Sequence, residues 1–335
     1  MSNISKDYTP LLNVLETNKA TIFIRNLFKQ YLCKKLHLTE IVSPSIIESG
    51  NGFQDDLNGI ERPVKFDIPF FNKQGEILQD NCKWRRAFLS KNNFPSHTGI
   101  YATLDCGLRR DESILDNTHS IIINNATWEI VIDEKDRTIK FLQNTVKKIM
   151  KQLYLVQEKL NKEYPKLKKF FTESITFLTS QELENLYPNL SPSERETEWT
   201  KTNKNNLCVM KIGYPLNSGK PHDKRSPDYD DWELNFDILV YYSILDKAIE
   251  IGGGGIRVTK DELIKQCNNV NYKVNLKTNY HQSILNDLYK KTMGGAFGGD
   301  RICMIMLNKC HIGEIRPSIW DNDTISKFKN IGIDL

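Results

Sequence analysis

The chain has 335 residues, of which 39% are hydrophobic and 26% charged, so it can bury a large core. A formal net charge of only +4 does not indicate a nucleic-acid partner, and no apolar run is long enough to span a membrane. The polar N-terminus lacks the pattern of a signal peptide, and an odd number of cysteines, seven, without a Cys-x-x-Cys pair predicts reduced thiols in a cytoplasmic protein.

Hydrophobic periodicity predicts the secondary structure in chain order. Apolar residues at helical spacing predict two long helices, over residues 11–36 and 138–163. Shorter helices are expected from Lys83 onward, after a capping box at 259–262, and over 281–291 and 302–307. Strands are predicted over residues 40–47, 64–70, 99–108, 120–132, 174–178, 208–214, 238–242 and 248–251.

Most of the predicted strands follow one another without a helix between them. This order favours an α+β fold in which helices flank a mainly antiparallel β-sheet. We expect one catalytic domain over residues 1–335.

The first candidate site lies between Asp237 and Arg257. Asp237 and Glu250 stand near the ends of two apolar runs that are typical of paired antiparallel strands. Such a pair would place two hard carboxylate ligands for Mg2+ on one surface. Gly253 and its glycine neighbours let a ligand approach bare backbone, and Arg257 is a cation that stays charged. Together these residues predict phosphate chemistry on a β-sheet.

Two further motifs carry arginines. Arg109 can hold a phosphate and a carboxylate through forked hydrogen bonds, and Glu112 can accept a hydrogen bond from an adenine amino group. Judged by this motif alone, a solvated charged turn is the better supported alternative. Arg301 follows the glycine-rich loop 294–299 at the start of a helix, where its charge opposes the helix dipole. A nearby anion would offset this unfavourable interaction with the helix dipole. The alternative is that the glycine loop is needed only for packing.

The order of these motifs along the chain is similar to that in class II aminoacyl-tRNA synthetases. More narrowly, the chain resembles ammonia-dependent asparagine synthetases of the A type over nearly its full length. The matching segments are Asp55-Asp-Leu-Asn-Gly59, Lys83-Trp-Arg-Arg86, residues 108–112, 222–232 and 234–240, and His311-Ile-Gly-Glu314. The resemblance implies synthesis of asparagine from aspartate, ammonia and ATP with Mg2+, through a β-aspartyl adenylate. It also implies a homodimer that needs no nucleic acid.

The resemblance assigns roles around the nucleotide. Arg109 would hold the α-phosphate together with the substrate carboxylate, and Glu112 would hold adenine. Arg301 would lie against the nucleotide. Asp230, in the motif Pro-Asp-Tyr-Asp-Asp, would line the same site without a defined role.

The resemblance also assigns roles in metal binding and in amide formation. Asp237 and Glu250 would hold Mg2+. Asp55 would orient or deprotonate the incoming nitrogen. Lys83 and Arg85 would supply positive charge for a substrate carboxylate. Asp55, Lys83 and Arg109 are therefore the expected catalytic residues.

The pocket for the acid departs from the family pattern. The family reads Val-Asp-Gln-Trp-Asp-Trp-Glu where this chain reads Ile-Asn-Asn-Ala-Thr-Trp-Glu at 123–129. Asn125 and Thr127 thus replace a glutamine and a carboxylate, and a carboxylate there would pair with a substrate ammonium. Asp80 is a gained charge that could receive the amine from the other side or repel a ligand carboxylate. Around Gly253 and Arg257, glycines replace two serines and a methionine, which enlarges the substrate pocket.

Three functions stay open at this point. The first is an amide ligase that makes asparagine, and the second is a relative that activates another acid or uses another amine. The third is a ligand sensor without catalysis. A decayed copy would be expected to lose residues such as Arg109, Asp237 or Arg301, and all are present, which favours an active enzyme. The altered segment 123–129 favours the second function over the first, whereas the other motifs support both.

Overall fold

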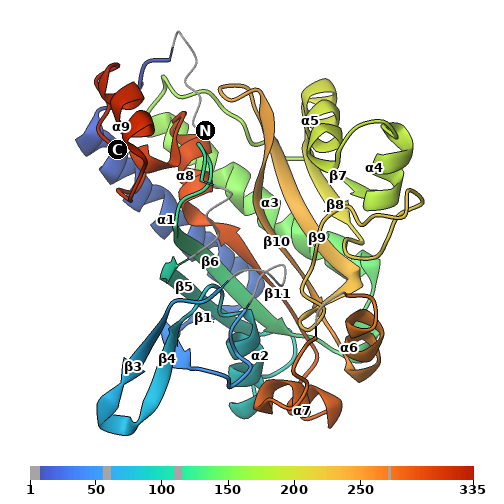
Figure 1. Ribbon diagram of the computed structural model, residues 1–335. Coiled ribbons are helices and arrows are strands. Elements are labelled where there is room, and N and C mark those ends of the chain that lie inside the picture. Colours follow the sequence, from blue (N-terminus) through green and yellow to red (C-terminus); the bar gives the residue numbers. More distant parts are fainter. Residues whose placement is uncertain (1–7, 56–61, 109–114, 271–272) are drawn as a thin grey trace.

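A computed structural model describes residues 8–55, 62–108, 115–270 and 273–335. Its centre is an eight-stranded sheet in the order β1-β5-β6-β11-β10-β9-β8-β7 (Figure 1). The two outermost pairs, β1 with β5 and β7 with β8, are parallel, and the other neighbours are antiparallel. The strands are β1 Leu38–Glu40, β5 Gly99–Leu108, β6 Ile122–Val131, β7 Ile175–Thr179, β8 Asn206–Met210, β9 Asp230–Tyr242, β10 Lys247–Arg257 and β11 Thr292–Gly298.

Helices and a small second sheet surround this sheet. The long helices α1 and α3 pack together behind it, and α8 joins them in the largest apolar cluster (Figure 1). The small sheet, in the order β2-β4-β3, projects from the opposite end to α4 and α5 (Figure 1). Its strands are β2 Ile46–Glu48, β3 Lys65–Ile68 and β4 Lys73–Ile77. The helices are α1 Val14–Leu36, α2 Cys82–Lys91, α3 Ile139–Glu163, α4 Ser180–Leu186, α5 Pro192–Asn203, α6 Lys260–Cys267, α7 Asn279–Leu285, α8 Gly299–Met306 and α9 Asn322–Lys329.

The caps and apolar spacing of α1 explain why it forms where it does. Asn13 and Glu16 form a capping box that satisfies backbone N–H groups at its start. Ile24, Phe28 and Leu32 recur at helical spacing and are buried against the sheet and α3. Burying such side chains contributes about 2 kcal/mol each, so this stripe holds α1 on the sheet.

The predicted α+β fold with a mainly antiparallel sheet is confirmed, with several local corrections. Most of the segment 294–299, expected as a glycine-rich loop, belongs to β11, and the strand predicted over 208–214 ends at Met210. The strand predicted over 40–47 is wrong between β1 and β2, because Pro44 cannot donate a ladder hydrogen bond there. The helix predicted over 281–291 starts at Asn279 and ends at Leu285, and Asp287 has a left-handed backbone (φ 53°). None of the described helices combines the length and the apolar character needed to cross a membrane.

Candidate active site

A cleft of about 240 Å³ lies over the middle of the main sheet. Strands β6, β10 and β11 form its floor, and the first turns of α2 and α8 contribute to its walls. Among the residues predicted from the sequence, nine line it: Asp55, Asp80, Arg85, Asn125, Asp230, Glu250, Gly253, Arg257 and Arg301. Arg109 and Glu112 lie outside the described residues.

The floor of the cleft is bare backbone because β10 and β11 pair glycine against glycine. In the register of the two strands, Gly254 faces Gly295 and Gly255 faces Gly294. A Cβ atom on Gly254 would lie 2.2 Å from the carbonyl oxygen of Gly294, and one on Gly294 would lie 2.0 Å from Oε2 of Glu129. The glycines are therefore required for packing, and they also leave the floor open to a ligand.

A buried ion pair lies against the floor, beside Gly294. Arg257 donates from Nε to Oε1 of Glu129 at 2.8 Å and also binds Asp230, and only 2% of its side chain is exposed. Burial raises the pKa of Glu129, but the charge and hydrogen bonds of Arg257 together with the charge of Arg85 hold that pKa below its usual value. Arg85 adds a second cation, with Nε 3.5 Å from Oε2 of Glu129. Both arginines are thus fixed in orientation before any substrate binds.

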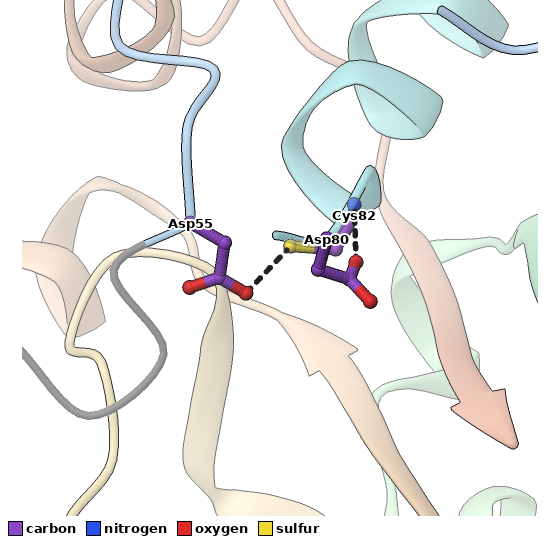
Figure 2. Close-up of side chains that lie close together, drawn as sticks. All are labelled: Asp55, Asp80 and Cys82. Atoms are coloured by element: carbon purple, nitrogen blue, oxygen red, sulfur yellow. Dashed lines mark hydrogen bonds between the residues drawn. The ribbon is translucent and has the colours of Figure 1, made fainter. Parts of the chain in front are cut away.

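Asp55, Asp80 and Cys82 lie close together at the inner end of the cleft (Figure 2). The backbone N–H of Cys82 donates to Oδ1 of Asp80 at 2.7 Å, and its Sγ lies 3.6 Å from Oδ2 of Asp55. One ligand atom from each residue lies within 4.8 Å of the others. Burial and the two carboxylates raise the pKa of the Cys82 thiol, so it stays protonated and donates to Asp55.

Negative charge slightly exceeds positive charge among the residues that line the cleft. Asp80 accepts one short hydrogen bond, from the backbone N–H of Cys82 at 2.7 Å, whereas Nδ2 of Asn125 is 3.4 Å and Nη1 of Arg85 is 3.6 Å from its carboxylate oxygens. The carboxylates that line the cleft are those of Asp55, Asp80, Asp230, Glu250 and Asp300, and they outnumber by one the guanidinium groups of Arg85, Arg225, Arg257 and Arg301. A buried surplus of carboxylates suits a ligand that carries a positive charge.

Asp237 and Glu250 lie on one face of the sheet. Glu250 lies opposite Leu239 in the register of β9 and β10. Asp237 is two residues before Leu239 on β9, so its side chain lies on the same face of the sheet. The carboxylate of Asp237 lies over bare Gly253, since a Cβ there would be 2.2 Å from Oδ1. This buried Oδ1 has no hydrogen-bond partner among the described residues, whereas Oδ2 binds Arg225. The donor set therefore fits one hard cation.

Arg301 reaches into the cleft from the start of α8. It donates to the carbonyl oxygens of Thr118, at 3.1 Å, and of Glu250, at 2.9 Å. Its Nη1 is also 3.7 Å from Oε2 of Glu250, so the arginine and the acidic pair share one wall.

Two residues expected to touch the substrate do not line the cleft. The Thr127 hydroxyl is buried and donates to the carbonyl oxygen of Ala102 on β5 at 2.6 Å. The Lys83 ammonium is buried too and lies 2.7 Å from Asp228. Since neither polar group faces the cleft, the expectation that they contact the substrate directly is corrected.

Sequence reasoning missed other residues of the cleft. Gln79 lines it with a fully buried side chain whose two amide atoms lack hydrogen-bond partners among the described residues. Arg225 lines it beside Asp237. Arg225 lies in the matching segment 222–232, so that motif could have revealed it. Gln79 precedes Asp80 in a segment that departs from the family pattern, which could have drawn attention to it.

Comparison with known proteins assigns the chain to a family. The family model described as aspartate-ammonia ligase matches residues 15–332. The chain belongs to the aspartate–ammonia ligase family. It is 42% identical over 335 residues to a Clostridium perfringens (strain SM101) protein named aspartate–ammonia ligase, with 99% of this chain and 98% of that protein covered. A Ureaplasma urealyticum protein of the same name is 40% identical, with 96% and 97% covered.

Solved structures show the fold of this ligase family member. An Entamoeba histolytica asparaginyl-tRNA synthetase in complex with asparaginyl-adenylate matches with a TM-score of 0.63 at 16% identity, covering 90% of this chain and 66% of that one. A Pyrococcus horikoshii asparaginyl-tRNA synthetase complexed with asparaginyl-adenylate matches with 0.63 at 14%, covering 92% and 70%. The ligase thus has the fold of a class II aminoacyl-tRNA synthetase core, and its family makes it a carbon–nitrogen ligase.

Proposed function

We propose that this ligase makes asparagine from aspartate, ammonia and ATP, and releases AMP and pyrophosphate. The observation that carries the proposal is the convergence of Asp55, Arg257, Glu250 and Arg301 on one cleft with a bare backbone floor. Its relatives at about 40% identity are named for this reaction. The whole chain serves as one adenylate-forming domain.

In the first step, an oxygen of the aspartate β-carboxylate attacks the α-phosphorus of ATP. A carbon-bound oxygen joins phosphorus, and the bond from phosphorus to pyrophosphate breaks. This step needs alignment and charge neutralisation more than covalent help from the protein. Arg301 from the cleft wall and Arg109 supply positive charge to the phosphates, and Glu112 holds adenine. Asp230 fixes Arg257 beside them.

Asp237 and Glu250 hold Mg2+ in this proposal. Both are hard ligands on one sheet face, and the buried Oδ1 of Asp237 lacks a protein partner among the described residues. When bound, Mg2+ neutralises charge on the phosphate groups. Arg225 keeps the Asp237 carboxylate oriented through the other oxygen.

In the second step, the nitrogen of ammonia attacks the activated carbonyl carbon. A carbon–nitrogen bond forms, the bond to the AMP oxygen breaks, and the nitrogen loses a proton. Asp55 is the base beside this reaction, because its carboxylate is at the inner end of the cleft and only 2% of the residue is exposed.

The amino group of aspartate binds to Asp80. Its Oδ1 accepts from the backbone N–H of Cys82, whereas its Oδ2 has a 3.4 Å contact to Asn125 and can accept from a substrate ammonium. Arg85 and Arg257 provide the positive charge for the α-carboxylate, and the backbone at Gly253 leaves room for the substrate. Asn125 lies 3.4 Å from Asp80 and helps to orient it.

The protein works as a cytoplasmic homodimer without nucleic acid in this proposal. On α1, Val14, Leu15 and Ile22 are 72%, 73% and 60% exposed, and a second copy would cover such an apolar surface. The cysteines whose side chains are described are all free thiols, as in a reducing compartment.

The direct test supplies the purified protein with ATP, Mg2+, aspartate and isotopically labelled ammonia. Labelled asparagine should form in equal amounts with AMP. Formation of ADP in place of AMP would contradict the adenylate. Formation of an amide only from another acid would support the second candidate, which the absence of a carboxylate at Thr127 favours.

A further inference from the structure

A buried polar network lies behind the inner wall of the cleft. The Lys83 ammonium, at the start of α2, donates to Oδ2 of Asp228 at 2.7 Å and to the carbonyl oxygen of Gln54 at 3.0 Å. Nε2 of His281 lies 2.7 Å from the same Asp228 oxygen, and the Ser226 hydroxyl donates to the other at 2.8 Å. The network therefore joins α2, the segment before β9 and α7 to the chain that carries Asp55.

The charges of this network are balanced inside the protein. Lys83, Asp228 and His281 are 4%, 3% and 4% exposed. Burial raises the pKa of Asp228, but the charge of Lys83 and the hydrogen bond from His281 outweigh it and hold this pKa well below its usual value. Asp228 is thus a carboxylate at neutral pH. Because a buried ion pair with good hydrogen bonds has one preferred geometry, Lys83 has a fixed position.

Lys83 is one of several contacts that fix the backbone immediately before Asp55. The Gln54 side chain donates to the carbonyl oxygen of Ile77 at 2.9 Å, and its Oε1 accepts from the backbone N–H groups of Gln79 at 3.0 Å and Asp55 at 3.2 Å. Gly52 has a φ of 88° and lies so close to Thr278 that a Cβ would be 2.1 Å from its hydroxyl oxygen. The chain that leads into Asp55 is therefore held from both sides.

We propose that Lys83 is a positioning residue that acts through Asp55. It holds the Gln54 carbonyl, and thereby keeps the Asp55 carboxylate where the nitrogen attacks the activated acid. Lys83 itself does not line the cleft and touches no substrate. This inference rests on the proposed role of Asp55 in the second step. Its consequence is that Lys83 serves amide formation and not adenylation.

The test separates the two steps. Lys83→Met is combined with Asp228→Asn, so that no uncompensated charge stays buried. Pyrophosphate exchange with aspartate reports adenylation, and asparagine formation reports both steps. The double variant should keep exchange within about twofold of the wild type. Its kcat/KM for ammonia should fall about 100-fold, since small misplacements at a reacting centre cost that much.

Three comparisons make the result specific. Asp55→Asn should show the same split between the two assays. Lys91→Met is the matched control, because this lysine is exposed at the other end of α2, and it should leave both assays unchanged. Gln54→Ala loosens the same segment without touching a buried charge, because it removes the side-chain hydrogen bonds to Ile77, Gln79 and Asp55 and keeps the carbonyl that Lys83 binds. It should reproduce the split if the double variant does not fold.

Other outcomes would overturn the inference. An equal loss in both assays by folded variants would mean that Lys83 has a general structural role. No loss in either assay would mean that the Gln54 contact does not matter. If Asp55→Asn still formed asparagine at the wild-type rate, Asp55 would not be the group that Lys83 positions. If the wild type showed no exchange with any acid, the proposed function would fail instead.

Discussion

Arg257 and Glu129 bind each other through two parallel hydrogen bonds beside the glycine floor of the cleft. Both side chains are almost fully buried, at 2% and 0% exposure. A forked pair of this kind fixes the plane of the guanidinium group, so Arg257 faces the cleft in one orientation. The Arg257 partner Asp230 belongs to β9, and thus three strands are joined at the site.

Replacing Glu129 with glutamine should destabilise the protein strongly. The change keeps the shape of the side chain but leaves Arg257 and Arg85 with less negative charge in a buried place. Breaking such a pair costs about 3 kcal/mol of unfolding free energy. Urea unfolding measures the loss, with Glu134→Gln as the control because that glutamate is exposed. Equal stability of the two variants would show that the buried pair does not stabilise the fold.

Asp80 should determine the choice of acid. Asp80→Ser removes the proposed partner of the aspartate ammonium, and the KM for aspartate should rise about 10- to 100-fold while the KM for ATP stays unchanged. An unchanged preference between aspartate and succinate in Asp80→Ser would place the ammonium elsewhere.

His311 should make the fold sensitive to acid. Its ring is fully buried, and Nδ1 accepts a hydrogen bond from the backbone N–H of Gly313 at 3.1 Å. Burial lowers the pKa of His311 from 6.5 to about 4, against the opposing charges of Asp116 and Asp321. Because the unfolded state binds this proton at higher pH, the His311 contribution to stability falls as pH drops from 6.5 to 4.

The loss from this one histidine should reach about 3 kcal/mol at the acid end of that range. Chemical unfolding at several pH values measures it, and His311→Gln should flatten the curve. The exposed His97→Gln serves as the control and should keep the wild-type slope. A His311→Gln curve as steep as that of the wild type would contradict the assignment.

Arg109 should be essential for adenylation and not for folding. Arg109→Ala removes the proposed contact to the α-phosphate, and pyrophosphate exchange should be abolished with an unchanged melting temperature. Arg110→Ala tests whether the loss of pyrophosphate exchange is specific to Arg109. Substantial exchange in Arg109→Ala would refute its role.

Local patterns made much of the fold predictable. The helices α1 and α3 follow from apolar spacing, and the break between β1 and β2 follows from Pro44, which the strand prediction overlooked. The pairing of β9 with β10, and hence one face for Asp237 and Glu250, followed from two apolar runs separated by a short turn. Such features depend on neighbours in the chain.

The network behind the cleft could not be predicted in this way. Lys83 and Asp228 are 145 positions apart, so their ion pair depends on how distant segments meet. The Thr127 hydroxyl is buried because the register of β5 and β6 places Ala102 opposite it. The sequence indicated the type of these residues, whereas packing decides whether each one faces the substrate.

The most direct test of the account is pyrophosphate exchange by the purified wild-type protein over a panel of acids. The wild-type protein should catalyse exchange that requires ATP, Mg2+ and aspartate, and that gives way to asparagine formation when ammonia is added. Exchange with another acid and none with aspartate, or no exchange with any acid, would contradict it.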